Sequence, residues 1–233
     1  MNNRKKRIAA LLLCVVMALS LCACAKPADA PDAAVDEYLA QLEGTYVELF
    51  PELSKEEYHD LWISSITEAA GADNAEAIYS MLLSMCMADV YGQEAADAYA
   101  ADQSAMRFDC YFLGGVKKFV FSGNTFSGLD ENGKEVFSHT YAPVENEADT
   151  GFLYYKTEDE NAGQFTYFAF SPDTPATTYH IEFRYAEDIA DLQSWFEGAY
   201  AYWNAAGILE NYDEQMMTDC INLFVTENAG GEN

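Results

Sequence analysis

The sequence predicts an α+β fold that is mostly β, in which helices flank an antiparallel meander or small barrel. Three observations predict this fold. Helix caps and apolar residues at helical spacing occupy residues 54–101, short aromatic runs between turn residues occupy 106–185, and helical patterns return at 188–225. The 233-residue chain shows no internal repeat, so we expect a single domain at residues 42–226 and a disordered tail at 227–233.

Capping residues mark two helices in the first part of this domain. Ser54 has the position of an N-cap and Glu57 the third position of a capping box, which predicts a helix that ends at Gly71. Asn74 is placed to cap a second helix, which we expect to break near Gly92 and to end near residue 101. The strands are expected to begin only after these helices.

The strands are predicted by aromatic runs that alternate with turn residues such as Asn132-Gly133. In the last predicted strand, Thr178–Tyr185, the odd-numbered residues are aromatic or apolar. Its even-numbered residues, which include His180, Glu182 and Arg184, are polar. Because successive side chains of a strand point to opposite faces, one face should be buried and the other should point toward polar surroundings.

Helical patterns return after this strand. Asp188 is a candidate N-cap for a short helix through about residue 197, and Asp213 begins a terminal helix that runs to about Val225. The predicted strands are therefore flanked by helices on both sides in the sequence.

The first 23 residues have the layout of a secretory signal peptide. A basic cluster at Arg4–Arg7 precedes the apolar run Ile8–Leu21, and small residues follow. The run is shorter than the roughly 20 apolar residues that a membrane-spanning helix needs. We therefore expect export of the chain and removal of residues 1–23.

The segment around the expected cleavage point resembles a bacterial lipobox. In Leu21-Cys22-Ala23-Cys24 a small residue precedes Cys24, whereas Cys22 follows the bulky Leu21 and fits the pattern less well. The alternative is an ordinary signal peptide that contains cysteines. With a lipid on Cys24, the protein would be anchored to the outer face of the cell membrane, and residues 24–41, rich in Ala, Pro and Asp, would form a tether.

The charge balance limits the possible partners. The chain has 39 acidic and 12 basic residues, a formal net charge of -27. Nucleic acid is excluded as a partner, since phosphate binding depends on a surplus of Lys and Arg. Removal of residues 1–23 takes away four basic residues and no acidic one, which leaves eight against 39 and a charge of -31. This acidity could concentrate divalent cations or simply keep the surface solvated.

Three cysteines remain after the signal peptide and Cys24: Cys86, Cys110 and Cys220. Their spacing matches no CxxC zinc motif. A disulfide between Cys86 and Cys110 is compatible with export, and buried free thiols are the alternative. The sequence also lacks a Gly-x-Ser-x-Gly elbow, a Walker loop and a His-Glu-x-x-His motif, so we expect no enzymatic activity.

Several segments together resemble one known family, the ZinT (YodA-like) domain. Leu42–Leu53 resembles its opening segment, in which an aromatic residue follows Gly by two positions and an aromatic-Pro-x-Leu sequence precedes the first helices. Tyr167–Ser171 and Thr178–Phe183 correspond to a strand and to the His-x-His strand of the family. Asp191–Trp203 resembles the acidic-aromatic helix and its Trp/Tyr-rich exit, without the usual Pro. The resemblance extends over residues 42–226.

This resemblance implies a calycin-like antiparallel barrel that binds zinc outside the cytoplasm at one mouth of the barrel. Family members hold the metal with three His, two in the His-x-His strand and one in the preceding loop. Here only His180 is retained, Thr178 stands at the first position of the pair, and Asp173 is the residue nearest the loop position. The family's His-rich N-terminal stretch is missing. A metal transporter is the partner that the family resemblance suggests.

The residues near His180 supply further candidate ligands. Glu182 leaves the same face of a strand as His180, and Asp173 could complete a set of one nitrogen and two carboxylates. That set suits Mn, Mg or Ca at least as well as zinc. His139, in the predicted strand 135–141, is a fourth candidate ligand. The competing hypothesis treats His180 as a hydrogen-bonded internal residue and the protein as a metal-free envelope module that binds a small ligand or a protein.

Overall fold

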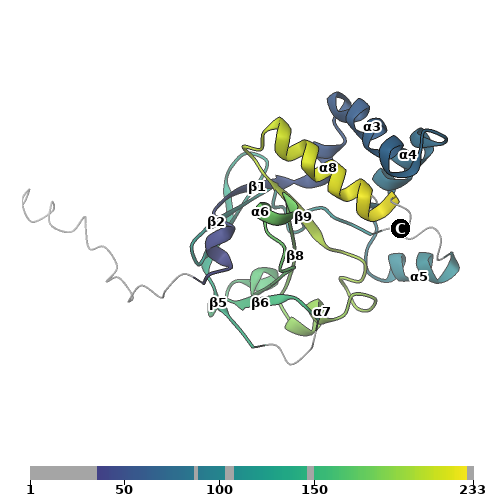
Figure 1. Ribbon diagram of the computed structural model, residues 1–233. Coiled ribbons are helices and arrows are strands. Elements are labelled where there is room, and N and C mark those ends of the chain that lie inside the picture. The colour runs from purple at the N-terminus through teal and green to yellow at the C-terminus, as the bar shows by residue number, and fades with distance from the viewer. Residues whose placement is uncertain (1–35, 87–88, 103–107, 146–149, 230–233) are drawn as a thin grey trace, which may run out of the picture. The chain divides into compact units, whose positions relative to one another are not determined.

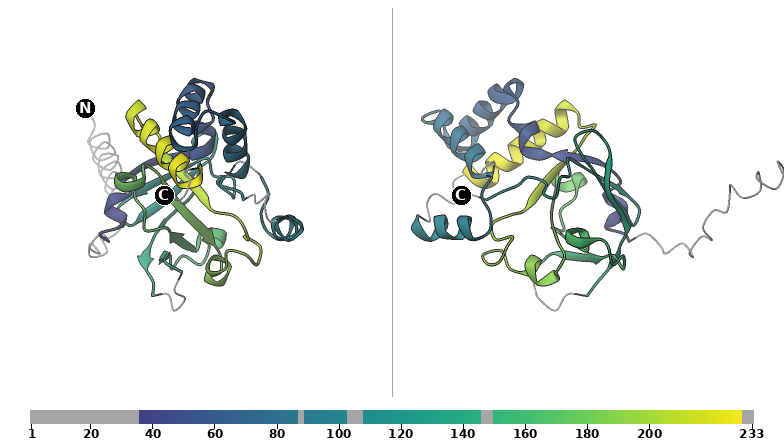
Figure 2. Two further views of the ribbon diagram at one scale, coloured as in Figure 1. Left: turned by 45° about the vertical axis from the view of Figure 1, so that its right-hand side comes forward. Right: turned by 180° about the vertical axis from the view of Figure 1, so that it is seen from behind.

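An antiparallel sheet of nine strands forms the centre of the protein. The computed structural model describes residues 36–86, 89–102, 108–145 and 150–229, and residues 35–233 form one compact unit. Neighbouring strands are antiparallel in the order β4-β3-β2-β1-β9-β8-β7-β6-β5, and the sheet curls into a nearly closed barrel (Figures 1 and 2). The strands are β1 (Gly44–Glu48), β2 (Lys118–Ser122), β3 (Thr125–Leu129), β4 (Glu135–Thr140), β5 (Ala142–Pro143), β6 (Leu153–Lys156), β7 (Tyr167–Phe170), β8 (Ile181–Ala186) and β9 (Ala205–Leu209).

The expected α+β, mostly β, calycin-like fold is confirmed, but the expectation that strands begin only after the first helices is wrong, because β1 precedes α2 and α3. In Figure 1, α3, α4 and α8 lie together beside β1 and β9. The α-helices are α2 (Leu49–Leu53), α3 (His59–Ala70), α4 (Ala75–Cys86), α5 (Gln93–Ala101), α6 (Pro175–Thr178), α7 (Ile189–Gln193) and α8 (Glu214–Ala229); the 3-10 turns are η1 (Leu39–Gln41), η2 (Glu56–Tyr58) and η4 (Gly163–Phe165).

Aromatic side chains fill the interior of the barrel. Phe119 contacts Phe183 edge to face, with ring centroids 4.9 Å apart, and Phe126 stacks on Tyr141 at 4.2 Å. These rings come from alternate positions of their strands, and each is fully buried. Tyr141 is not part of a strand itself; it joins β4 to β5, the two edge strands of the sheet. The interior is thus a packed aromatic core.

A second core lies between the barrel and the helices. Ala206 and Ile208 of β9 point outward and pack against buried residues of α3, α4 and α8, among them Trp62 and Ile221. Because Ala205 of the same strand faces the barrel core, β9 is buried on both faces. The same layer contains Cys86, Cys110 and Cys220, which are free and buried, so the Cys86–Cys110 bridge is absent and the alternative of buried thiols applies.

The first predicted helix begins later than its capping signal indicated. Ser54 closes α2, and its hydroxyl group donates to the carbonyl of Pro51 instead of capping a helix. After η2, α3 begins at His59 and ends at Gly71, as expected, where φ is 88°. The break near Gly92 is also confirmed, since α5 begins at the following residue.

The last predicted strand is three residues shorter at its beginning than expected. Thr174 caps the helical turn α6 with a capping box, and Pro175 occupies its first position. Tyr179 follows in the left-handed conformation, with φ of 66°, so β8 starts only at Ile181. Thr178 and His180 therefore lie before the strand, and only Glu182 and Arg184 of the predicted polar face belong to it.

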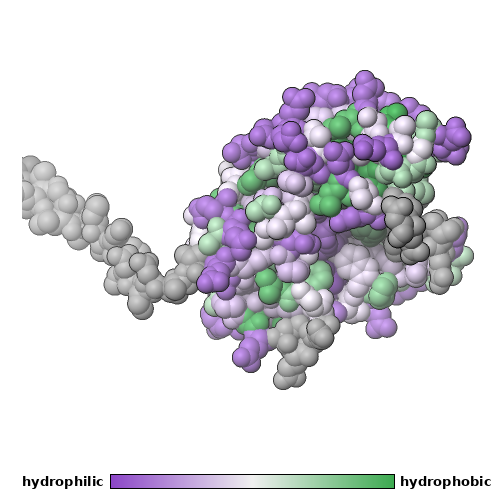
Figure 3. Space-filling view, viewed as in Figure 1, coloured by the Kyte–Doolittle hydropathy of each residue, from purple (hydrophilic) through white to green (hydrophobic). Residues whose placement is uncertain are grey.

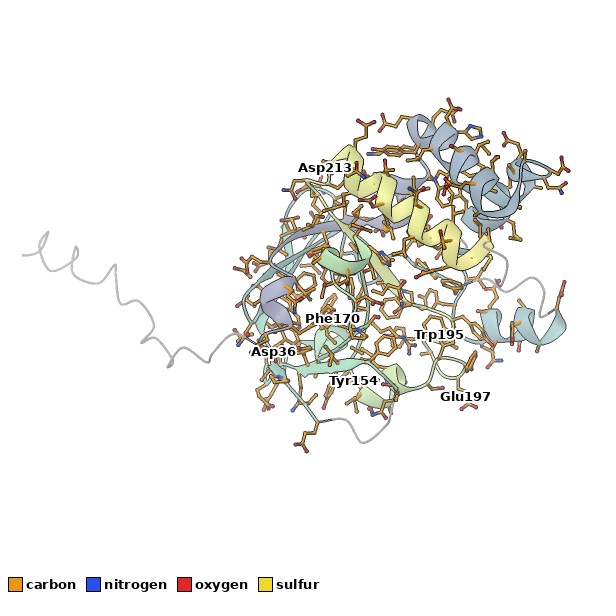
Figure 4. The ribbon with its side chains drawn as sticks, in the orientation of Figure 1. Asp36, Tyr154, Phe170, Trp195, Glu197 and Asp213 are labelled. Atoms are coloured by element: carbon orange, nitrogen blue, oxygen red, sulfur yellow. The ribbon has the colours of Figure 1, made fainter. Side chains whose placement is uncertain are left out.

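Arg184 also differs from its expected surroundings, because it is 1% exposed and lies inside the protein. Its guanidinium group donates to the carbonyl groups of Leu192, Ser194 and Tyr200 at 2.7, 3.1 and 2.6 Å. The same group lies over the ring of Trp195, which Figure 4 labels in the loop that follows α7. A buried cation that donates to carbonyl groups fixes this loop to β8.

The ends of the described chain are more ordered than the domain boundaries suggest. From Asp36 onward the predicted tether packs against the barrel: Leu39 is 1% exposed, and the Tyr38 hydroxyl group donates to the carbonyl of Ser171 at 2.7 Å. Asp213 begins the last helix by accepting from the backbone N–H of Met216, and α8 continues to Ala229. Signal residues 1–23, Cys24, and residues 230–233 of the tail lie outside the described residues.

Candidate metal site

His180 lies at the junction between α6 and β8, in a bend that the local sequence enforces. The capping box of Thr174 and the left-handed Tyr179 turn the chain back before the strand begins. The imidazole ring is thereby placed beside α8, where the Sγ atom of Cys220 lies 4.0 Å from Nδ1. Only 14% of the His180 side chain is exposed, so the ring is largely shielded from solvent.

The hydrogen bonds of the ring determine which nitrogen is available. Nδ1 lies 2.6 Å from the carbonyl oxygen of Thr178, an arrangement in which Nδ1–H donates. Nε2 is then the nitrogen that holds the exchangeable proton, and it faces the Oε1 atom of Glu182 at 3.5 Å. A backbone carbonyl that orients imidazole in this way is a common feature of metal-binding His residues.

Glu182 is oriented from its other side. Its Oε2 atom accepts from the side-chain amide of Asn204 at 2.9 Å, just before β9 begins. The carboxylate is 40% exposed, so the space near Nε2 remains accessible to solvent. His180 and Glu182 therefore present one nitrogen and one oxygen donor toward each other, each held by a second hydrogen bond.

The protonation of His180 is coupled to these neighbours. Burial opposes the charged ring, but the Cys220 sulfur and the Glu182 carboxylate outweigh burial and raise the pKa of His180 well above its usual value. At low pH the proton on Nε2 forms an ion pair with Glu182. A metal ion needs the same lone pair, so proton and metal compete for one position.

The structure does not bring the other candidate ligands to this pair. The Oδ2 atom of Asp173 accepts from the Ser171 hydroxyl group at 2.8 Å. His139 lies in β4, at one edge of the sheet, with Nδ1 3.1 Å from the Oδ2 atom of Asp159. In the part of the chain that the structure describes, no group of three or more His, Cys, Asp or Glu side chains is placed to hold a metal ion.

Two residues near the candidate site were not identified in the sequence. Asn204 fixes the Glu182 carboxylate, and Cys220 lies beside the His180 ring, although it is 40 residues away in the chain. Neither belongs to a motif that could have shown its role. Thr178 contributes through its backbone carbonyl, while its hydroxyl group is turned to the carbonyls of Thr174 and His180.

Comparison with solved structures agrees with the barrel topology. The chain is similar to the Zn(II)-bound ZinT-like domain of AdcA from Streptococcus pneumoniae, with a TM-score of 0.50 and 16% identity over 82% of this chain and 93% of that domain. The chain has a ZinT-like fold. Zn(II)-bound AdcA itself matches with a TM-score of 0.44 and 17% identity; 81% of this chain and 36% of AdcA are covered.

The comparisons of sequence find no relative of the chain, in contrast to the comparison of structures. No protein-family model matches the chain, and no curated protein sequence matches it. The similarity to the AdcA domain shows the fold alone, since only 16% of the residues are identical. In this chain His180 stands at the second position of the pair that the resemblance implied as His-x-His ligands, and Glu182 lies two residues beyond it.

Proposed function

We propose that this protein binds a divalent metal ion, zinc foremost, through His180 and Glu182 in metal acquisition or homeostasis. The observation that carries the proposal is the orientation of His180. Nδ1 donates to the Thr178 carbonyl, so Nε2 faces the Glu182 carboxylate and is the nitrogen at which a metal ion could replace the proton. The ZinT-like fold supports the same proposal, since a zinc-bound domain shares it.

The donor set fits an open site better than a closed one. Structural zinc sites have four protein ligands, whereas His180 and Glu182 supply two. Water or a partner's side chain would complete the coordination, and such a site releases its metal readily. We therefore propose a carrier that exchanges metal with a transporter at the membrane, and not a protein that stores it.

The proposed location rests on the sequence. A lipid on Cys24 would hold the carrier at the extracytoplasmic face of the cell membrane, close to a transporter. Among the described residues, no helix is long and apolar enough to cross a membrane.

Calorimetric zinc titration of the mature chain, residues 25–233, tests the metal proposal. We expect saturable binding that is lost in His180→Ala and weakened by at least about tenfold in Glu182→Gln, because each variant removes one of two donors. His139→Ala is the matched control, since His139 pairs with Asp159 and should leave zinc binding unchanged. Absence of saturable heat in all proteins would favour the metal-free envelope module.

The same titration at two pH values tests the competition between proton and metal. Because the pKa of His180 is raised well above its usual value, Nε2 keeps its proton to a higher pH than a free imidazole would. Zinc affinity should therefore increase from about pH 6 to about pH 8, and the His180→Ala variant should lose this dependence.

The lipid anchor is tested by fractionation of cells that express the full chain. The natural protein should remain with the membrane and shift into detergent, whereas Cys24→Ala should be released or retain its signal peptide. Cys22→Ala is the control and should behave like the natural protein. A Cys24→Ala variant that is processed and still membrane-bound would show that the anchor is not this lipid.

A further inference from the structure

A cleft with an acidic wall opens where the chain enters β2. Its volume is about 430 Å³, and it is lined by Asp89, Asp109, Tyr111, Phe112, Leu113 and Lys117. The cleft shares no residue with the His180–Glu182 pair. Nothing in the ZinT-like resemblance assigns a role to it.

Asp109 is the unusual residue of this cleft. It is fully buried, and its backbone is held on both sides: its N–H donates to the carbonyl of Tyr202 and its carbonyl accepts from the N–H of Asn204, both at 2.9 Å. The Oδ1 atom accepts from the N–H of Tyr111 at 2.7 Å. The Oδ2 atom is buried and has no hydrogen-bond partner, which is costly for a carboxylate.

No basic side chain of the described residues pairs with Asp109 to offset its negative charge. Asp89 lines the same cleft, and its carboxylate and that of Glu48 both disfavour a charge on Asp109. Lys117 is a lining residue, but its ammonium group is paired with Glu48, at 3.1 and 3.2 Å from the two oxygens. Among the described residues, no ion pair involves Asp89 or Asp109. Burial, with these carboxylates, raises the pKa of Asp109 to about 6.

From this geometry we infer that Asp109 and Asp89 bind a hard divalent cation, of the Ca²⁺, Mg²⁺ or Mn²⁺ class, in the cleft. The unpartnered Oδ2 atom of Asp109 would be one ligand and the Asp89 carboxylate a second. Water would complete the coordination, because the cleft is open to solvent and such cations keep several waters when one or two carboxylates hold them. All donors are oxygen atoms, a set that suits hard cations better than zinc.

A bound cation would neutralise the negative charges of Asp89 and Asp109, which the described residues do not pair. A dication between the two carboxylates offsets their mutual repulsion and satisfies the buried oxygen. A proton shared between Asp89 and Asp109 could relieve the same strain without any metal, and this is the competing explanation. The two explanations differ in whether added cation is bound.

Calorimetric titration of the mature chain with Ca²⁺ and with Mn²⁺, each alone, tests the inference. We expect saturable binding of at least one ion, weakened by at least about tenfold in Asp109→Asn and in Asp89→Asn, since each variant removes a direct ligand. The His180→Ala variant should bind these ions normally. Glu131→Gln, in an exposed turn, is the control for general attraction of cations to a polyanion, and it should leave binding unchanged.

A thermal-unfolding assay gives a second readout that does not depend on heat of binding. The added ion should raise the unfolding temperature of the natural chain and of Glu131→Gln, but not that of Asp109→Asn. Asn preserves the acceptor for Tyr111 and removes the buried charge, so this variant should fold. The inference is overturned if neither ion binds saturably, or if Asp109→Asn and Asp89→Asn bind as well as the natural chain does; failed zinc binding at His180 leaves it untouched.

Discussion

Two buried ionisable side chains show how single residues are stabilised differently in this protein. Arg184 donates from its terminal nitrogens to three backbone carbonyls and lies over the ring of Trp195, although its buried Nε atom has no hydrogen-bond partner. Asp109 has one backbone donor for Oδ1 and none for Oδ2. The first arrangement ties a loop to the barrel, whereas the second leaves a carboxylate whose charge the fold opposes.

The opposed charge of Asp109 predicts a pH-dependent stability. Because the pKa rises from 3.8 to about 6 on folding, the fold favours the protonated form, and that contribution is complete below about pH 4 and lost as the pH passes 6. Asp109→Asn should therefore be as stable as the natural chain near pH 4.5, and more stable by about 2 kcal/mol near pH 7.5. Urea unfolding in the presence of a chelator measures the difference.

A difference between the two proteins that stays constant with pH would contradict this account. Asp130→Asn is not a suitable control, because Asp130 accepts hydrogen bonds from its own turn. Glu131→Gln in the same turn is suitable, and it should follow the natural chain at both pH values.

At the scale of the element, the junction between α6 and β8 decides the candidate site. A strand from Thr178 would have placed His180 and Glu182 as equivalent neighbours on one face. The capping box of Thr174 and the left-handed Tyr179 instead put His180 in a bend. In the bend, the ring N–H donates to the Thr178 carbonyl and is oriented by it. In a regular strand this carbonyl would have accepted from a neighbouring strand instead.

The N-terminal turn η1 is a second element whose structural role was not predicted from its sequence. Asp36 accepts from the N–H groups of Tyr38 and Leu39 and from the Tyr155 hydroxyl group, and Figure 4 labels it where the described chain begins. Leu39 packs into the aromatic core with Phe170 among its cluster. The element thus covers part of the barrel core, although Ala, Pro and Asp around it are typical of a tether.

Truncation of Leu39 should therefore destabilise the whole barrel. We expect Leu39→Ala to lower the free energy of unfolding by about 2–5 kcal/mol, since it leaves a cavity in a packed core. Glu37→Ala, two residues away and exposed, should change it by less than about 0.5 kcal/mol. Urea unfolding of both variants decides the question, and equal effects would mean that η1 does not contribute to the folded unit.

For the molecule as a whole, topology brings distant segments together. The edge strands β4 and β5 are consecutive in the chain, so the sheet nearly closes with a single residue, Tyr141, between them. The helices before and after the strands meet on β9, with Ala206 and Ile208 beneath them. The face shown in Figure 3 is mostly hydrophilic, with scattered apolar residues, as expected for a chain with a formal charge of -27.

That charge has different consequences at different places on the molecule. Most of the carboxylates are exposed and cost little, because solvent and salt screen them. Asp109 and Glu182 are exceptions: one is buried beside other acids, and the other is held beside His180. An excess of acidic residues raises the concentration of cations near the surface. Only donors held in a fixed arrangement can select a particular cation.

The sequence by itself determined the kind of fold and its limits. Periodicity, turn residues and the ZinT-like segments predicted strands between helices, and His180 and Glu182 were recognised as neighbours because they are only two residues apart. The end of α3 at Gly71 and the start of α5 after Gly92 followed from glycine, whose φ can be positive without strain. Such local features depend on residues that are close in the chain.

Only the tertiary structure decided which distant groups meet and which do not. It separated Asp173 and His139 from His180, brought Asn204 and Cys220 to it, and buried Arg184 and Asp109. These contacts join residues of different strands and helices, and no spacing in the chain encodes them. Burial then fixes the chemistry, because the cost of a charge depends on the solvent and partners that the folded chain leaves around it.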